Sequence, residues 1–167
     1  LRTADLVACA GCYPTSAILP TTALLEAGVV SPKGIIVSSC SGVTGAGRKV
    51  DLPYIFPECN ESVRAYGIVG HRHLPEIEQE MAVAAGLPEM AINFIPHLVP
   101  MNRGINSTIV MDAMPGCTIE KVGEALNKAY AGEQFVRILP AGRPADTKYV
   151  FMTNCCEIGY AYDAHTN

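Results

Sequence analysis

The stretch GCYPTSAILPTTALLEAGVVSPKGIIVSS, residues 11–39, contains the first helix and the first strand that the sequence predicts. Apolar residues recur at helical spacing after Cys12, and Gly28 is placed to end the helix. Pro20 lies inside this segment, so we expect it to kink the helix or to divide it in two. The apolar run at 34–39 then predicts a buried strand.

The rest of the chain alternates less regularly between helix and strand patterns. Further helices are predicted at 76–86 and at 117–132, the second one capped by Thr118. Strand patterns occupy five other segments, which are 91–95, 105–113, 135–139, 148–152 and 156–163. Because several strands follow one another without an intervening helix, we predict an α+β fold: a mixed, mostly antiparallel sheet with helices packed on one face.

Length, composition and charge exclude several classes of protein. The 167 residues suit one domain, and 49% hydrophobic with 17% charged residues is typical of a globular chain. A net charge of −4 without a Lys/Arg run argues against a nucleic-acid partner, and the apolar runs are too short to span a membrane. No signal peptide pattern is visible, and seven cysteines are an odd number for a disulfide scaffold. We therefore expect a cytoplasmic location.

Cys12 stands at the start of a predicted helix, where free backbone N–H groups and the helix dipole favour a thiolate. A thiol is ordinarily only a few per cent ionised at neutral pH, and a helix N-terminus lowers its pKa by at most about one unit. A neighbouring imidazole is the usual second contribution. His71 and His73 lie in GHRHLPEIE (70–78), immediately before the second helix, and are the candidates for it.

Other kinds of site fit the same residues. Cys9 and Cys12 form a Cys-x-x-Cys pair, which occurs in redox proteins, and with His71 and His73 they supply four ligands for a tetrahedral zinc ion. A buried, unreactive thiol in a non-catalytic assembly module is a third reading. From the residues alone, a zinc-stabilised or redox binding module and a catalytic cysteine both remain open.

The segment CSGVTGAGRK (40–49) predicts a glycine-rich loop after the first strand. Its glycines allow the backbone to approach a ligand closely, and the terminal Arg48 and Lys49 suit an anion. It is not a G-x-G-x-x-G sequence, so it predicts no dinucleotide fingerprint.

Five segments of this chain occur in the order typical of one enzyme family and extend from about residue 7 to residue 163. They are GCYPT (11–15), SGVTGAGRK (41–49), AYGIVGHRHLPEIEQE (65–80), FIPHLVPMNRGI (94–105) and FVRILPAGRPADTKYVFMTNCCEIG (135–159). Together they resemble N-acetyl-γ-glutamyl-phosphate reductase. The resemblance implies NADPH-dependent reduction of N-acetyl-γ-glutamyl phosphate to the semialdehyde in arginine biosynthesis, through a cysteine thioacyl-enzyme.

The resemblance also implies a role for each matching residue, and no metal site. Cys12 falls on the family's nucleophile, and His71 on the position that we assign to the acid/base partner. The implied substrate-orienting groups are His73 and Glu76, with Arg48, Lys49 and Arg103 as candidates for binding phosphate or carboxylate. Ser41 and Gly42 would lie near the nicotinamide end of the cofactor.

The implied fold is that of the C-terminal domain of glyceraldehyde-3-phosphate-dehydrogenase-like enzymes. We expect residues 1–167 to be one catalytic and dimerisation domain, excised from a longer two-domain enzyme. NADPH would then be bound mainly by a Rossmann domain absent from this chain, and the domain would associate as a homo-oligomer through its sheet. One departure is Cys9-Ala10 where the family commonly has a proline before Gly-Cys, and from it we predict an inactivating Cys9–Cys12 disulfide under oxidation.

Overall fold

The structure is a computed structural model that describes residues 3–166. Its main feature is a four-stranded mixed sheet in the order β2-β3-β1-β4. The strands are β1 (Ile36–Ser41), β2 (Arg64–Ala65), β3 (Asn93–Leu98) and β4 (Ile105–Val110). β1 pairs parallel with β3 and antiparallel with β4, and β2 pairs antiparallel with β3. A second, two-stranded sheet pairs β5 (Val136–Ile138) in parallel with β6 (Cys156–Ile158).

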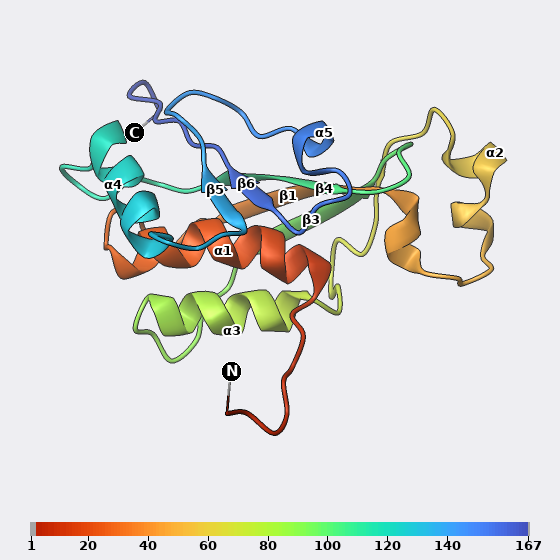
Figure 1. Ribbon diagram of the computed structural model, residues 1–167, viewed down its shortest axis with the longest axis horizontal. Coiled ribbons are helices and arrows are strands. Elements are labelled where there is room, and N and C mark those ends of the chain that lie inside the picture. Colours follow the sequence, from red (N-terminus) through yellow and green to blue (C-terminus); the bar gives the residue numbers. More distant parts are fainter. Residues whose placement is uncertain (1–2, 167) are drawn as a thin grey trace.

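The long helices are α1 (Cys12–Glu26), α3 (Leu74–Ala84) and α4 (Ile119–Ala129). The short helical segments are η1 (Val43–Ala46), η2 (Leu52–Tyr54), α2 (Phe56–Cys59) and α5 (Thr147–Val150). Figure 1 shows α1 and α3 side by side on one side of the sheet, both beginning at the same end, with α4 at the other end of α1. The predicted α+β fold with a mixed sheet and helices on one face is confirmed. Within residues 3–166, none of the helices is long and apolar enough to cross a bilayer.

α1 agrees with the helix predicted from the sequence and ends where the glycine was expected to end it. Gly28 has a φ of +65°, which residues with a side chain adopt at a cost. Pro20 lies inside α1, yet the helix continues through it as one element and is not divided. The Thr21 and Thr22 hydroxyls donate to the carbonyl groups of Ala17 and Ile18 in this part of the helix. Pro20 has no N–H to donate within the helix. The two hydroxyl groups supply other donors to backbone carbonyl groups in the same segment.

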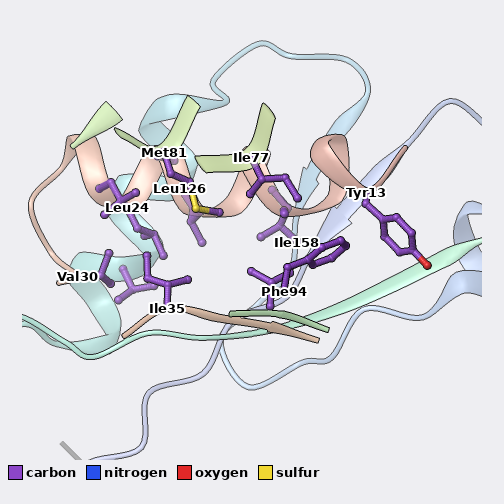
Figure 2. Packing of buried hydrophobic residues seen from close by; sticks show 14 residues of the cluster. Tyr13, Leu24, Val30, Ile35, Ile77, Met81, Phe94, Leu126 and Ile158 are labelled. Carbon is purple, nitrogen blue, oxygen red and sulfur yellow. The ribbon is translucent and has the colours of Figure 1, made fainter. Parts of the chain in front are cut away.

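The hydrophobic core lies between the helices and the sheet. Figure 2 shows Ile77 and Met81 of α3 and Leu126 of α4 close to Ile35 and Phe94, which come from the sheet side. Ile35, Ile77, Met81 and Leu126 have no measurable exposure. In β1 the side chains alternate, and Val37, Ser39 and Ser41 are the buried ones. The sheet therefore has one covered face and one face that is only partly covered.

The strand predicted at 148–152 is wrong. Residues 147–150 form α5, and the Asp146 side chain caps this turn by accepting the Lys148 N–H at 3.0 Å. Tyr149, Val150 and Phe151 favour strands by propensity, but a strand also needs a partner and a face to bury. The local cap determines the conformation instead.

Burial of α3 against α1 predicts the effect of two matched substitutions. Ile77→Ala should lower the free energy of unfolding by about 2–5 kcal/mol, because it leaves a cavity in a fully buried position. Val83→Ala, on the same helix but 71% exposed, should change it by less than about 0.5 kcal/mol. Urea unfolding followed by circular dichroism measures both, and equal effects would contradict the described packing.

Candidate functional site

Cys12 is the first residue of α1, and Gly11 before it is the N-cap residue. The Cys12 side chain is exposed rather than sealed in the core. α3 begins close by at Leu74, and Figure 1 shows the two helices starting at the same end. The N-terminus of α1, which carries Cys12, therefore lies beside the N-terminus of α3.

Glu76, in the first turn of α3, connects the two helix N-termini. Its two carboxylate oxygens accept the N–H of Gly11 at 3.2 and 3.3 Å. Gly11 also has no room for a side chain, since a Cβ there would lie 2.9 Å from His73 Nε2 and 2.9 Å from the Pro14 ring. The glycine of GCYPT is thus required by close packing of His73 against the turn that carries Cys12.

The two histidines of the GHRH segment lie together at this place and differ in their hydrogen bonds. Their rings are 5.0 Å apart, and His71 Nδ1 accepts the backbone N–H of His73 at 3.1 Å. Neutral His71 therefore carries its hydrogen on Nε2 and is a donor there. Burial lowers the pKa of His71, and the neighbouring His73 and Arg72 lower it further. Burial followed by Arg72 lowers the pKa of His73, against a smaller opposing effect of Glu76.

Two tyrosines that the sequence did not single out complete the group of rings. Tyr13 and Tyr66 share a hydrogen bond between their hydroxyl oxygens at 2.8 Å. The His71 ring lies 5.5 Å from the Tyr13 ring and 5.7 Å from the Tyr66 ring, in edge-on geometry. Tyr13 is adjacent to Cys12, but no spacing in the sequence connects it to Tyr66, which lies 53 residues further along.

A cavity of about 800 Å³ opens beside Cys12. Ser41 and Gly42, predicted near the cofactor, are among its lining residues, whereas His71 and His73 are not. Within the described part of the chain, its lining contains no Lys or Arg, and its charged members are Asp146 and Glu157. This cavity offers hydroxyl, amide and apolar surface but no cationic side chain.

Three serine hydroxyls connect α1 to the sheet at the wall of this cavity. Ser107 of β4 lies 2.7 Å from Ser39 of β1 and 2.8 Å from Ser16 of α1, measured between hydroxyl oxygens. Ser39 is fully buried, and Ser16 and Ser107 line the cavity. Ser16 also donates to the carbonyl group of Tyr13 at 2.9 Å. The first turn of α1 is therefore held by the sheet as well as by α3.

Gly42 is needed because another part of the backbone packs against it. A Cβ at Gly42 would lie 2.8 Å from the Asn102 carbonyl group and 2.9 Å from the Arg103 nitrogen. The Gly42 N–H donates to the Gly104 carbonyl oxygen at 3.0 Å, and the Thr44 N–H donates to that of Asn102 at 3.2 Å. The predicted glycine-rich loop is thus fixed to residues 101–104 on one side, while Ser41 and Gly42 face the cavity on the other.

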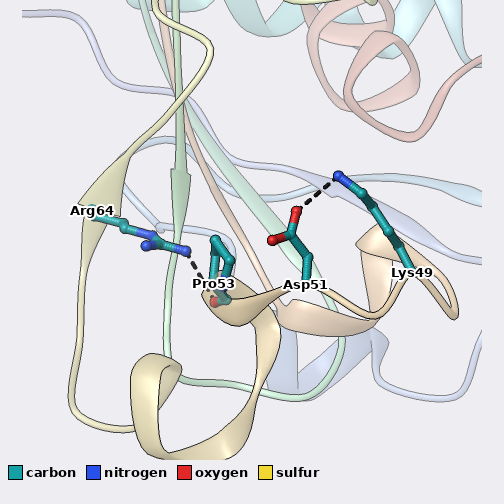
Figure 3. A network of polar contacts seen from close by, with 4 residues as sticks. All are labelled: Lys49, Asp51, Pro53 and Arg64. Atoms are coloured by element: carbon teal, nitrogen blue, oxygen red, sulfur yellow. Dashed lines mark hydrogen bonds and ion pairs between the residues drawn. The ribbon is translucent and has the colours of Figure 1, made fainter.

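The three predicted anion-binding residues do not line the cavity with Cys12. Arg48 and Lys49 lie in the segment that projects beyond the sheet toward α2 (Figure 1). Figure 3 shows Lys49 bound to Asp51, with Nζ 2.8 Å from the carboxylate oxygen. Arg103 lines a separate, smaller groove with Lys148 and Phe151. These three basic residues therefore lie outside the cavity beside Cys12.

All seven cysteines are free thiols in the structure. Cys9 and Cys12 are both exposed and unlinked, so the predicted disulfide under oxidation stays a prediction. Among residues 3–166, no group of three or more His, Cys, Asp or Glu side chains is arranged to hold a metal ion. The zinc alternative built on Cys9, Cys12 and the two histidines therefore has no support in the geometry.

The comparisons with known proteins agree on one family. Residues 12–167 match the family model for the semialdehyde dehydrogenase dimerisation domain. N-acetyl-γ-glutamyl-phosphate reductases from Akkermansia muciniphila and Moorella thermoacetica are 52% and 45% identical over 98% and 99% of this chain. The chain spans about half the length of these curated relatives, 47% and 48%. The resemblance inferred from the five motifs is confirmed.

Solved structures agree on the fold. Aspartate semialdehyde dehydrogenase II from Vibrio cholerae is similar over 99% of this chain and 55% of its own, with a TM-score of 0.72 at 12% identity. The enzyme from Francisella tularensis is similar over 87% of this chain and 53% of its own, with a TM-score of 0.60 at 14% identity. At these identities the likeness shows a shared fold, in agreement with the predicted fold class.

The lowered histidine pKa values predict how stability depends on pH. A histidine whose folded pKa lies below the usual value of about 6.5 binds fewer protons folded than unfolded. Stability is then fully present above pH 6.5 and is lost as the pH falls from there through the folded pKa. His71→Gln should flatten this loss in chemical unfolding at pH 5–7, and exposed His165→Gln serves as the control. A wild-type stability that does not change over this range would contradict the prediction.

Proposed function

The chain belongs to the family of semialdehyde dehydrogenase dimerisation domains, and we propose that it is the catalytic part of an NADP-dependent oxidoreductase. The proposed reaction is the NADPH-dependent reduction of N-acetyl-γ-glutamyl phosphate to N-acetyl-glutamate semialdehyde and phosphate, in arginine biosynthesis. The relatives that bear the name of this reductase support the proposal. The observation that carries the proposal is the exposed thiol of Cys12, which lies at the N-terminus of α1 and beside the N-terminus of α3.

Cys12 is the proposed nucleophile. Its thiolate attacks the acyl carbon, a sulfur–carbon bond forms, and phosphate leaves with the electron pair of the broken carbon–oxygen bond. When the resulting thioester has been reduced, the hemithioacetal oxygen returns its electron pair to carbon. The carbon–sulfur bond then breaks, the aldehyde is released, and Cys12 is again a thiolate.

NADPH, when bound, supplies the hydride, and the cavity beside Cys12 suits only one part of that molecule. Ser41 and Gly42 border a space large enough for a planar ring. The lining described for this cavity has no Lys or Arg to bind phosphate groups. We therefore propose that Ser41 and Gly42 lie near the nicotinamide and that the rest of the dinucleotide is held mainly outside these 167 residues.

His71 is the proposed acid/base partner. Its lowered pKa keeps it neutral at physiological pH, and its Nε2 hydrogen is then available to a substrate oxygen. To accept the thiol proton on Nε2, neutral His71 needs the other tautomer, which carries its hydrogen on Nδ1. In that tautomer Nδ1 no longer accepts the N–H of His73. The hydrogen bonds described here therefore favour donation by His71 over abstraction.

The remaining predicted substrate residues take different proposed roles. His73 and Glu76 contact the turn of Gly11, so we propose that they orient the substrate indirectly, by fixing Cys12. Arg103 is the proposed cation for phosphate or carboxylate, because its backbone lies against Gly42 at the cavity wall. Arg48 and Lys49 are secondary candidates, because neither lines the cavity beside Cys12 and Lys49 is already paired with Asp51.

Protomers are proposed to associate through the sheet face turned away from the helices. Ile36 and Val110 pair in register across β1 and β4 and are 38% and 55% exposed. The family's description as a dimerisation domain supports this assembly. We place the protein in the cytoplasm, where seven free thiols remain reduced.

Replacing the nucleophile tests the proposal. In a polypeptide that also carries a dinucleotide-binding domain, Cys12→Ser should lower NADPH oxidation by roughly 10⁴-fold or more, because a hydroxyl does not replace the thiolate. Cys9→Ser, three residues away, should leave the rate within about twofold.

Alkylation of the chain itself gives an independent measurement. In a stoichiometric iodoacetamide titration at several pH values, Cys12 should react first and well below pH 8.5. Equal and slow reaction of all seven cysteines would contradict the proposed nucleophile.

A further inference from the structure

The glycine-rich loop after β1 uses its backbone N–H groups within the chain. The N–H groups of residues 42–45 all donate to backbone carbonyl groups, three of them to residues 101–104 and one within the loop, at 3.0–3.3 Å. Free N–H groups are what such a loop offers to a phosphate group. Because all four are already bound, the loop has no backbone donor left for an anion.

Five hydroxyl groups on the lining of the cavity beside Cys12 also use their hydrogens within the chain. A hydroxyl has one hydrogen, and a carbonyl oxygen can only accept. Four of the five donate to backbone carbonyl groups at 2.6–3.1 Å, namely those of Thr15, Ser16, Ser41 and Thr44. Since the hydrogen of Ser16 binds the Tyr13 carbonyl group, Ser107 is the donor in its contact with Ser16.

We call these five residues (Thr15, Ser16, Ser41, Thr44 and Ser107) the acceptor wall. Their oxygens can accept a hydrogen bond from a ligand, but their hydrogens are already bound to the protein. The other hydroxyl groups of the lining are not part of this wall and belong to Thr108, Thr147, Thr153, Tyr160 and Tyr162. A ligand group against the acceptor wall is therefore bound best when it is a hydrogen-bond donor.

The charged members of the described lining are two carboxylates, Asp146 and Glu157. Asp146 lies 3.5 Å from Lys148, and Glu157 lies 3.6 Å from Arg137. Neither cation lines this cavity, and their side chains are 67% and 51% exposed, so water screens them. The cavity therefore has a negative potential, which favours a cationic group and disfavours an anionic one.

Both carboxylates lie on the side of the cavity that the loop after β1 also borders. A Cβ at Gly104 would lie 3.4 Å from the Thr147 side chain, and the Gly104 carbonyl group accepts an N–H of this loop. Asp146 directly precedes Thr147. β6, which carries Glu157, is followed by a glycine that packs against residues 143–145. The two negative charges are thus close to the place proposed for the nicotinamide.

We propose that the cavity beside Cys12 binds the nicotinamide ring more tightly in its oxidised, cationic form than in its reduced, uncharged form. The carboxamide N–H groups are donors for the acceptor wall, and the positive charge of the oxidised ring interacts with Asp146 and Glu157. Phosphate and carboxylate groups are excluded from the same cavity. This inference rests on the proposed function, which places the nicotinamide here, and it implies that the oxidised cofactor is retained as a product.

Three ligands of similar shape and different charge test this preference on the 167-residue chain. They are the 1-methylnicotinamide cation, uncharged nicotinamide and the nicotinate anion. Titrations followed by ¹H–¹⁵N NMR should show shifts of the amide signals of residues 41–45 and 104–108. The cation should bind about tenfold more tightly than nicotinamide, and nicotinate at least about tenfold more weakly than nicotinamide. The preference for the cation should decrease as the salt concentration is raised.

Removal of the two carboxylates identifies their contribution. Asp146→Asn combined with Glu157→Gln should bring the affinities for the cation and for nicotinamide within about threefold of each other. Asparagine still caps α5, so this turn is kept. Glu124→Gln combined with Glu133→Gln changes the net charge equally at exposed positions outside the lining and should leave the tenfold preference unchanged. Urea unfolding shows whether each variant is folded.

Nicotinate binding as tightly as the cation would overturn the inference, and so would the absence of saturable shifts at these amides with all three ligands. Both outcomes are read on the wild-type chain and do not depend on the variants. A folded carboxylate variant with an undiminished preference would overturn it as well. The titrations need neither turnover nor a reactive thiol. The proposed function fails separately, through absence of NADPH oxidation by the two-domain polypeptide or through an unreactive Cys12.

Discussion

The Glu76 carboxylate binds the N–H of Gly11, and through this contact α3 determines where α1 begins. Both helices then present their N-termini at one place, and Cys12 is the first side chain after the contact. The contact requires close approach, and His73 fills the space that a side chain on residue 11 would need. A glycine, a carboxylate and an imidazole from segments about 65 residues apart thus fix the position of one sulfur.

The sheet holds the same turn from the opposite side. Ser107 connects fully buried Ser39 to Ser16, and Ser16 binds the carbonyl group of Tyr13. A buried hydroxyl is costly without a partner, so this row of hydroxyls favours one register of α1 on the sheet. Because the turn is fixed on two sides, the thiol is presented at a defined position even though it is exposed. Such rigidity is what a nucleophile requires for attack along a single direction.

Local patterns in the sequence predicted the elements that local chemistry determines. The limits of α1 and the cap of α4 by Thr118 follow from a glycine and a hydroxyl within the segments themselves. The strand prediction at 148–152 is wrong for the same reason, since the local cap by Asp146 outweighs the strand propensity of these residues. Cys12, His71 and Glu76 stand out because they lie in motifs. The Tyr13–Tyr66 pair and the serine row involve residues 53 to 91 positions apart, so only the folded chain brings them together.

The described lining of the cavity beside Cys12 contains no cationic side chain, and this limits how a negative charge can be stabilised there. A helix N-terminus contributes only about 0.3–1 kcal/mol to the stabilisation of a nearby negative charge. Lys or Arg at the cavity wall would add more, but the described lining has none, and the basic residues lie outside it. A side-chain cation there would pair with the sulfur and would also lower its nucleophilicity. Fixed dipoles and neutral hydroxyl or imidazole donors avoid this, because they carry no full charge that would pair with the sulfur, and they stabilise negative charge at the position that they face.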